Sequence, residues 1–77
     1  MAEPTDDELM AAAAELQQAA DLARSLGVDL AQFEAYSDAG MPDLAYEALR
    51  QGAAERDMPF GFFMHLSKAA DLLGLRP

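Results

Sequence analysis

Residues 5–27, TDDELMAAAAELQQAADLARSLG, decide the fold of this chain. Thr5 and Glu8 have the spacing of a capping box, in which each side chain accepts a hydrogen bond from the other residue's backbone N–H. Gly27 follows the last apolar position and supplies a typical helix stop. The pattern therefore predicts a helix over residues 5–26.

One side of this predicted helix is apolar and consists largely of alanine. Its residues recur at intervals of three and four, which is the spacing of an amphipathic helix. Alanine side chains are short, so a neighbouring helix can approach them closely. The apolar stripe consists of Leu9, Ala12, Ala13, Leu16, Ala19, Ala20 and Ala23.

Three shorter helices are predicted downstream. Asp29 is in position to cap the second helix, and Gly40 ends it. Pro42 suits the first turn of the third helix, because its missing N–H would be unpaired there in any case. Gly74 is placed to end the fourth helix in a left-handed conformation. These helices are predicted over residues 29–39, 42–55 and 60–73.

The same spacing argument predicts which faces of the later helices lie in the core. Thr5 and Val28 are the only β-branched residues, which disfavours a sheet. We therefore predict an all-α fold, a compact bundle of four short helices in one domain over residues 1–77, with a flexible N-terminus at residues 1–4. The expected core faces are Leu44, Ala45, Ala48 and Leu49 in the third helix, and Phe63, Leu66, Ala70 and Leu73 in the fourth.

The chain is strongly acidic. Fourteen Asp and Glu residues stand against five Lys and Arg residues, giving a formal net charge of −9. Phosphate backbones and anionic membranes attract Lys and Arg, so we expect neither direct nucleic-acid binding nor membrane binding. A protein partner with a basic surface would instead be attracted, with faster association at low salt. The alternative, that the acids only keep the protein in solution, stays open.

Other features of the composition bear on cellular location. There is no cysteine, and the opening residues MAEPTDDEL lack the basic and then apolar pattern of a signal peptide. No apolar run approaches the roughly 20 residues that span a bilayer. We expect a soluble cytoplasmic protein. The abundant alanine, with four Arg against one Lys, suggests a GC-rich bacterial or phage genome.

The residues needed for common catalytic sites are scarce. His65 is the only histidine, and Ser67, two positions later on a helix, points away from it. The acids at positions 6–8 diverge around the helix axis, so they suit the helix dipole better than a metal ion. No phosphate-binding loop or zinc spacing is present. We therefore expect a protein that is not an enzyme and that uses no cofactor or metal.

The polar side of the third helix is a candidate binding surface. Helical spacing places Tyr46 opposite Leu44 and among charged residues, and exposed Tyr and Arg are enriched at interface hot spots. The alternative is that Tyr46 lies flat against a neighbouring helix. The end of the second helix could extend this surface. The candidate partner-binding residues here are Glu34, Tyr36, Asp38, Asp43, Tyr46, Glu47 and Arg50.

The fourth helix has apolar residues on more than one side. Phe60 and Met64 lie away from its predicted core face. A helix with this coverage is either buried on both sides or uses one side for a partner or a second copy of the chain. We therefore add Phe60 and Met64 to the candidate partner-binding residues, and a homodimer is possible.

Residues 41–75, MPDLAYEALRQGAAERDMPFGFFMHLSKAADLLGL, resemble the second half of small helical immunity-type proteins from bacterial polymorphic-toxin loci. The resemblance covers less than half of the chain and implies neutralisation of a cognate toxin, often a basic nuclease. It assigns no binding residue. The matching elements are Asp43-Leu44-Ala45, Leu49, Glu55, Pro59, Phe62-Phe63 and Leu73-Gly74-Leu75.

Three functions are consistent with the sequence. The first is an acidic protein of the immunity or antitoxin type, which binds and inhibits a partner protein. The second is a helical docking or adaptor module that mediates protein assembly, possibly as a dimer. The third is a phage anti-defence protein that mimics nucleic acid through its charge. The sequence favours the first.

Overall fold

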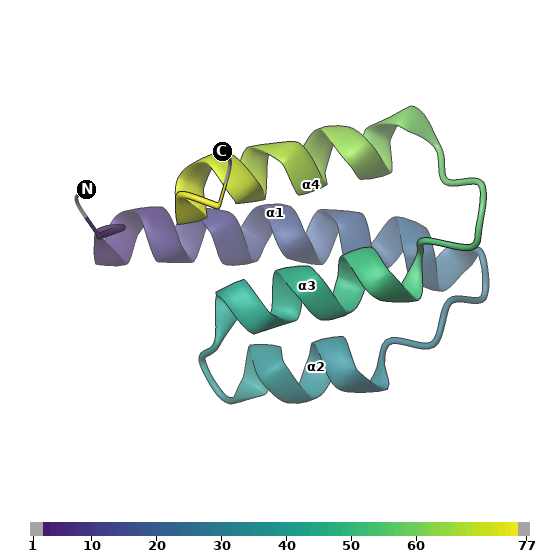
Figure 1. Ribbon diagram of the computed structural model, residues 1–77, viewed down its shortest axis with the longest axis horizontal. Coiled ribbons are helices and arrows are strands. Elements are labelled where there is room, and N and C mark those ends of the chain that lie inside the picture. Colours follow the sequence, from purple (N-terminus) through teal and green to yellow (C-terminus); the bar gives the residue numbers. More distant parts are fainter. Residues whose placement is uncertain (1–2, 76–77) are drawn as a thin grey trace.

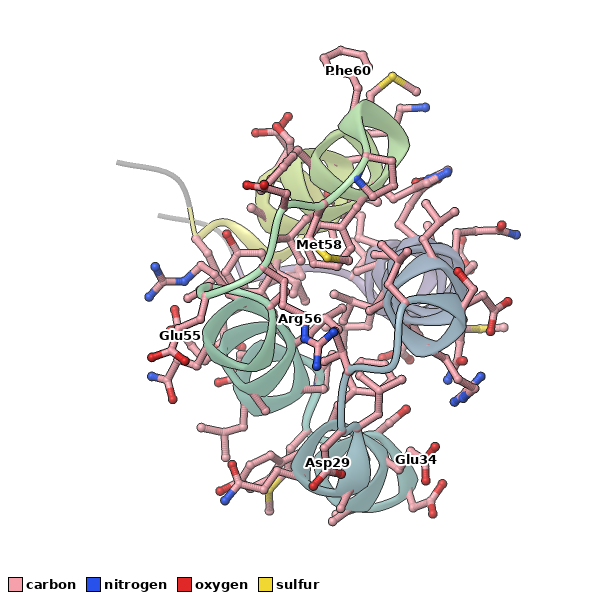
Figure 2. The ribbon with its side chains drawn as sticks, turned by 90° about the vertical axis from the view of Figure 1, so that its right-hand side faces the viewer. Asp29, Glu34, Glu55, Arg56, Met58 and Phe60 are labelled. Carbon is pink, nitrogen blue, oxygen red and sulfur yellow. The ribbon has the colours of Figure 1, made fainter. Side chains whose placement is uncertain are left out.

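The computed structural model describes residues 3–75 and confirms an all-α bundle of four short helices. Seen from one end, the helices surround a common centre, with α4 and α2 at opposite positions and α1 and α3 between them (Figure 2). Figure 1 shows α1 and α4 side by side along most of their lengths. The helices are α1 (Asp6–Ser25), α2 (Ala31–Asp38), α3 (Pro42–Gly52) and α4 (Phe60–Leu73).

The capping box at the start of α1 is present as predicted. The Glu8 amide donates to Thr5 Oγ1 at 3.1 Å, and the Thr5 amide donates to Glu8 Oε1 at 3.0 Å. Two backbone donors that have no partner inside the helix are thereby paired, which fixes the first residue of α1. The predicted flexible stretch 1–4 falls partly on residues 1–2, which lie outside the described residues.

Three helices end at a glycine with positive φ, as the sequence predicted. The values are 83° at Gly27, 72° at Gly40 and 69° at Gly74. After each glycine, the next amide donates to a carbonyl five residues back, the long hydrogen bond of a Schellman motif. These bonds are Val28 to Ala23 at 3.1 Å, Met41 to Tyr36 at 2.9 Å and Leu75 to Ala70 at 2.9 Å.

Two helix boundaries differ from the prediction. The second helix begins at Ala31, two residues late, because Leu30 is buried and adopts a non-helical conformation. The carboxylate of Asp29 still accepts a hydrogen bond from the Ala31 amide, at 3.0 Å. The third helix ends at Gly52, three residues early. Gly52 lies against the α1–α2 connection, since a side-chain carbon there would be in van der Waals contact with Val28 and with the Asp29 carbonyl oxygen, at 3.6 Å from each.

Alanine dominates the contact between α1 and α4. Six alanines in these helices are at most 3% exposed. The larger fully buried side chains are Phe33, Phe62, Leu16 and Leu49. Ala13, predicted to be in the apolar stripe, is exposed, because it lies on the flank of α1 beyond the buried face. The buried alanines are Ala12, Ala19, Ala20, Ala23, Ala69 and Ala70.

Two large residues predicted to be in the core are exposed. Phe63 is 52% exposed, and Phe62 takes the core position at 1%. Both rings have helical spacing to Leu66, so only the placement of α1 and α3 decides between them. They meet edge to face, with ring centroids 5.4 Å apart. Leu44 is 43% exposed, because the core face of α3 centres on Ala45 and Leu49 instead.

Arg56 joins the α3–α4 connection to the end of α1. Its Nη1 donates to the Leu26 carbonyl oxygen at 2.7 Å, across thirty residues of sequence. Figure 2 looks onto this end of the bundle and shows Arg56 near its middle. A cation at a helix C-terminus pairs a free carbonyl and complements the helix dipole. This contact positions the segment that leads into α4.

We predict that Ala19→Leu destabilises the bundle by about 1–3 kcal/mol, because the longer side chain overfills a packed contact. Ala19 is fully buried, and it lies one helical turn before Leu22. Leu22 packs close to Gly61 of α4, since a side-chain carbon added at Gly61 would lie 3.5 Å from Leu22 Cδ1. Urea unfolding followed by circular dichroism measures the change. Ala14→Leu, at an exposed position of the same helix, is the control, with an expected change within about 0.5 kcal/mol. Equal effects would contradict the packing described.

A second prediction tests which aromatic ring of α4 is in the core. Phe62→Ala is expected to lower the free energy of unfolding by about 3–5 kcal/mol, because it leaves a cavity. Phe63→Ala is expected to cost about 1 kcal/mol or less, because that ring is half exposed. Urea unfolding of both variants makes the comparison. A larger loss for Phe63→Ala would restore the helix orientation predicted from the sequence.

Candidate partner-binding surfaces

The single histidine links two helices. His65 Nδ1 of α4 lies 2.8 Å from Glu15 Oε2 of α1, and both side chains are partly buried. Within residues 3–75, no group of three His, Cys, Asp or Glu side chains is arranged to hold a metal ion. The His65 imidazole instead contacts the Glu15 carboxylate, and this contact joins α4 to α1.

The candidate residues of α2 face in different directions. Glu34 forms an ion pair with Arg24 of α1 at 2.9 Å, and Arg24 also pairs with Asp21 at 3.0 Å. Tyr36 is partly buried and packs against the core. Asp38 is exposed in the last turn of the helix. Of these residues, only Asp38 is an exposed group that a partner could contact without breaking an ion pair seen here.

The structure corrects the interpretation of Tyr46 as an exposed anchor. Tyr46 is partly buried and packs against the core, which is closer to the alternative interpretation than to a fully exposed side chain. Asp43 is exposed nearby. Arg50 Nη2 pairs with Glu47 Oε2 at 2.8 Å. The hydrogen bond and the charge of Glu47 raise the pKa of Arg50 above its ordinary value.

Two of the predicted residues of α2 and α3, Glu34 and Arg50, lie far apart on the bundle surface. Glu34 reaches toward α1 and lies on the side of α2 away from α3 (Figure 2). Arg50 instead borders a hollow between α3 and α4, beside Phe62 and Phe63. Glu34 and Arg50 therefore lie on different flanks of the bundle. The expectation that the end of α2 extends the polar side of α3 stays a prediction for Asp38 and Asp43, which lie on either side of the α2–α3 turn.

The outer side of α4 carries a cluster of exposed large apolar side chains. Phe60 is 78% exposed, Phe63 52% and Met64 41%. Positions i, i+3 and i+4 share one side of a helix, so the three lie together. Phe60 projects away from the other helices in Figure 2. We call these three residues the α4 face. Phe60 and Met64 were predicted to lie off the core, whereas Phe63 was missed because it was assigned to the core.

A hollow next to Phe63 extends the α4 face toward α3. Its volume is about 190 Å³. Apolar side chains form much of it, and two arginines border it. A partner seated on the α4 face would reach this hollow without moving any helix. The lining residues are Arg50, Gln51, Ala53, Ala54, Arg56, Phe62, Phe63 and Leu66.

Comparisons of the chain with protein-family models, with curated proteins and with solved structures find no match. The resemblance of residues 41–75 to immunity-type proteins therefore remains a prediction. Among the helices of residues 3–75, none has the length and apolar character needed to cross a bilayer. The assignment of the candidate binding surfaces therefore uses only the exposure and contacts of their side chains.

The contact between His65 and Glu15 predicts a measurable coupling between α4 and α1. In a double-mutant cycle with His65→Ala and Glu15→Ala, we expect a favourable coupling of about 0.5–1.5 kcal/mol, the usual range for a hydrogen bond. Urea unfolding of the four proteins at one pH gives this value. If the two single changes simply add, the contact contributes nothing to stability.

Proposed function

We propose that this chain is a non-catalytic protein that binds another protein through the α4 face. The observation that supports this most is the exposure of Phe60, Phe63 and Met64 together on one side of α4. A Phe side chain buries about 150–250 Å² when covered, so the three exposed groups offer roughly 300 Å² of apolar surface. Patches of this size on a small protein are often functional.

The charge of the chain supports a partner other than a second copy. Each copy has a net charge of −9, so two copies repel each other. A standard interface also needs about 800 Å² from each partner, more than the α4 face alone supplies. The remaining contact has to come from the polar surface around it, which holds both acids and bases, including Glu55, Asp57, Arg56 and Lys68. The net charge of the whole chain favours a partner with a basic surface.

Two acidic side chains lie in the segment that precedes the α4 face. Glu55 and Asp57 are exposed in the segment that leads into α4, and Glu55 lies at the same end of the bundle as Phe60 (Figure 2). An interface of this kind combines apolar anchors with a charged rim, where the anchors contribute most affinity and the rim speeds association. Within this proposal the chain covers a functional basic surface of its partner and so inhibits it, as an immunity protein or antitoxin does.

We predict that Phe60→Ser with Met64→Ser weakens partner binding about 30-fold or more, the effect of losing an interface hot spot. The experiment isolates the partner with the immobilised chain, purifies it and measures its dissociation constant by calorimetry. Leu44→Ser is the matched control, because Leu44 is a similarly exposed apolar residue on α3, and its effect is expected to be below about twofold.

Three further results decide the proposal. The dissociation constant of the purified partner should rise at least about tenfold between 50 and 300 mM salt, roughly as expected for attraction between opposite charges. A dissociation constant that does not change with salt would contradict the proposal that the partner has a basic surface. Equal losses of affinity for the α4 variant and for Leu44→Ser would contradict the proposal that the α4 face is the binding site. A stable homodimer that Phe60→Ser dissociates would show that the occupant is a second copy.

A further inference from the structure

A second apolar groove lies on a part of the bundle that α4 does not line. It runs between α1 and the α2–α3 turn and has a volume of about 210 Å³. Leu16 and Ala45 are buried at its base, and Met10 is 72% exposed at its edge. The groove is lined by Leu9, Met10, Ala13, Leu16, Ser37, Gly40, Pro42 and Ala45. We call it the α1–α2 groove.

The α1–α2 groove has an acidic edge. Asp6 and Asp7 precede Met10 by one helical turn and so lie on its side of α1. Asp38 follows the lining residue Ser37, and Asp43 follows Pro42. No Lys or Arg lies within four positions of any lining residue in the sequence. An occupant of this groove therefore meets an apolar floor and negative charge around it.

Asp38 has no local structural reason to be acidic. It lies in the last turn of α2, where the negative end of the helix dipole disfavours a carboxylate. The side chain is exposed, and within residues 3–75 it makes no hydrogen bond or ion pair. Asp6 and Asp7, by contrast, suit the first turn of α1. A basic group from a partner would relieve the unfavourable charge at Asp38.

We infer that the α1–α2 groove binds a basic, amphipathic helical segment of another protein. The groove is smaller than the roughly 300 Å³ of common small-molecule pockets, but it has room for one or two large apolar side chains. Lysine or arginine residues one turn away on the same segment would lie over Asp6, Asp7 and Asp38. This is helix-in-groove recognition, with apolar anchors for affinity and charge for selectivity.

This second site does not depend on the α4 face. The two surfaces share no residue, because Phe60, Phe63 and Met64 all belong to α4 and no α4 residue lines the groove. Failure of one proposal therefore leaves the other standing. If both hold, the chain contacts its partners on two separate surfaces and can bridge two protein segments.

The test uses a synthetic amphipathic peptide with leucines at helical spacing and lysines at the other positions. A matched peptide carries glutamate in place of lysine. Titration of the full chain, followed by amide chemical shifts, is expected to move residues of the α1–α2 groove with the lysine peptide and not with the glutamate peptide. Shifts confined to Phe60, Phe63 and Met64, or equal binding of both peptides, would overturn the inference.

Two matched pairs of variants make the test specific. Ala13→Trp fills the groove and is expected to weaken binding of the lysine peptide by about tenfold or more. Its control is Ala14→Trp, at an exposed position outside the groove, which is expected to change the affinity less than about twofold. Asp38→Asn is expected to weaken binding about threefold at low salt while raising the urea midpoint. Asp57→Asn, at the opposite end of the bundle, is its control. Equal effects within either pair would overturn the inference.

Discussion

The close contact of α1 with α4 through alanine side chains is the constraint on which the rest of the structure depends. Short side chains let the two helices lie side by side, as Figure 1 shows. Burying apolar surface stabilises a fold by about 25 cal/mol per Å² removed from water. Alanine side chains are small, so each one buries little apolar area and contributes little to this stabilisation. The bundle therefore needs its few large buried residues, Phe33, Phe62, Leu16 and Leu49, to complete the core.

The same constraint explains why large apolar side chains remain on the surface of α4. The buried residues of α4 are Phe62, Leu66, Ala69, Ala70 and Leu73, and they form one side of the helix. Phe62 fills the space within the bundle. Phe60 and Met64 lie off that side, and both are exposed. Their exposure thus follows from which side of α4 packs against the other helices.

Local signals in the sequence were enough to predict the helices. The capping box at Thr5 and the glycine at Gly74 act within a few residues, so the sequence alone locates them. The orientation of each helix about its own axis was harder to predict. Phe62 and Phe63 fit the helical spacing equally well, and Tyr46 could face the core or solvent. Those choices depend on neighbouring helices, and so does the separation of Glu34, which pairs with α1, from Arg50, which borders α4.

The basic residues of the described chain differ in whether an acid pairs with them. Arg24 is held between Asp21 and Glu34, and Arg50 is paired with Glu47. These contacts pair two of the four described cations with acids, whereas Arg56 donates to the Leu26 carbonyl oxygen and Lys68 is exposed on α4. The exposed acids Asp6, Asp7 and Asp38 lie beside the α1–α2 groove, so negative charge and exposed apolar side chains coincide there.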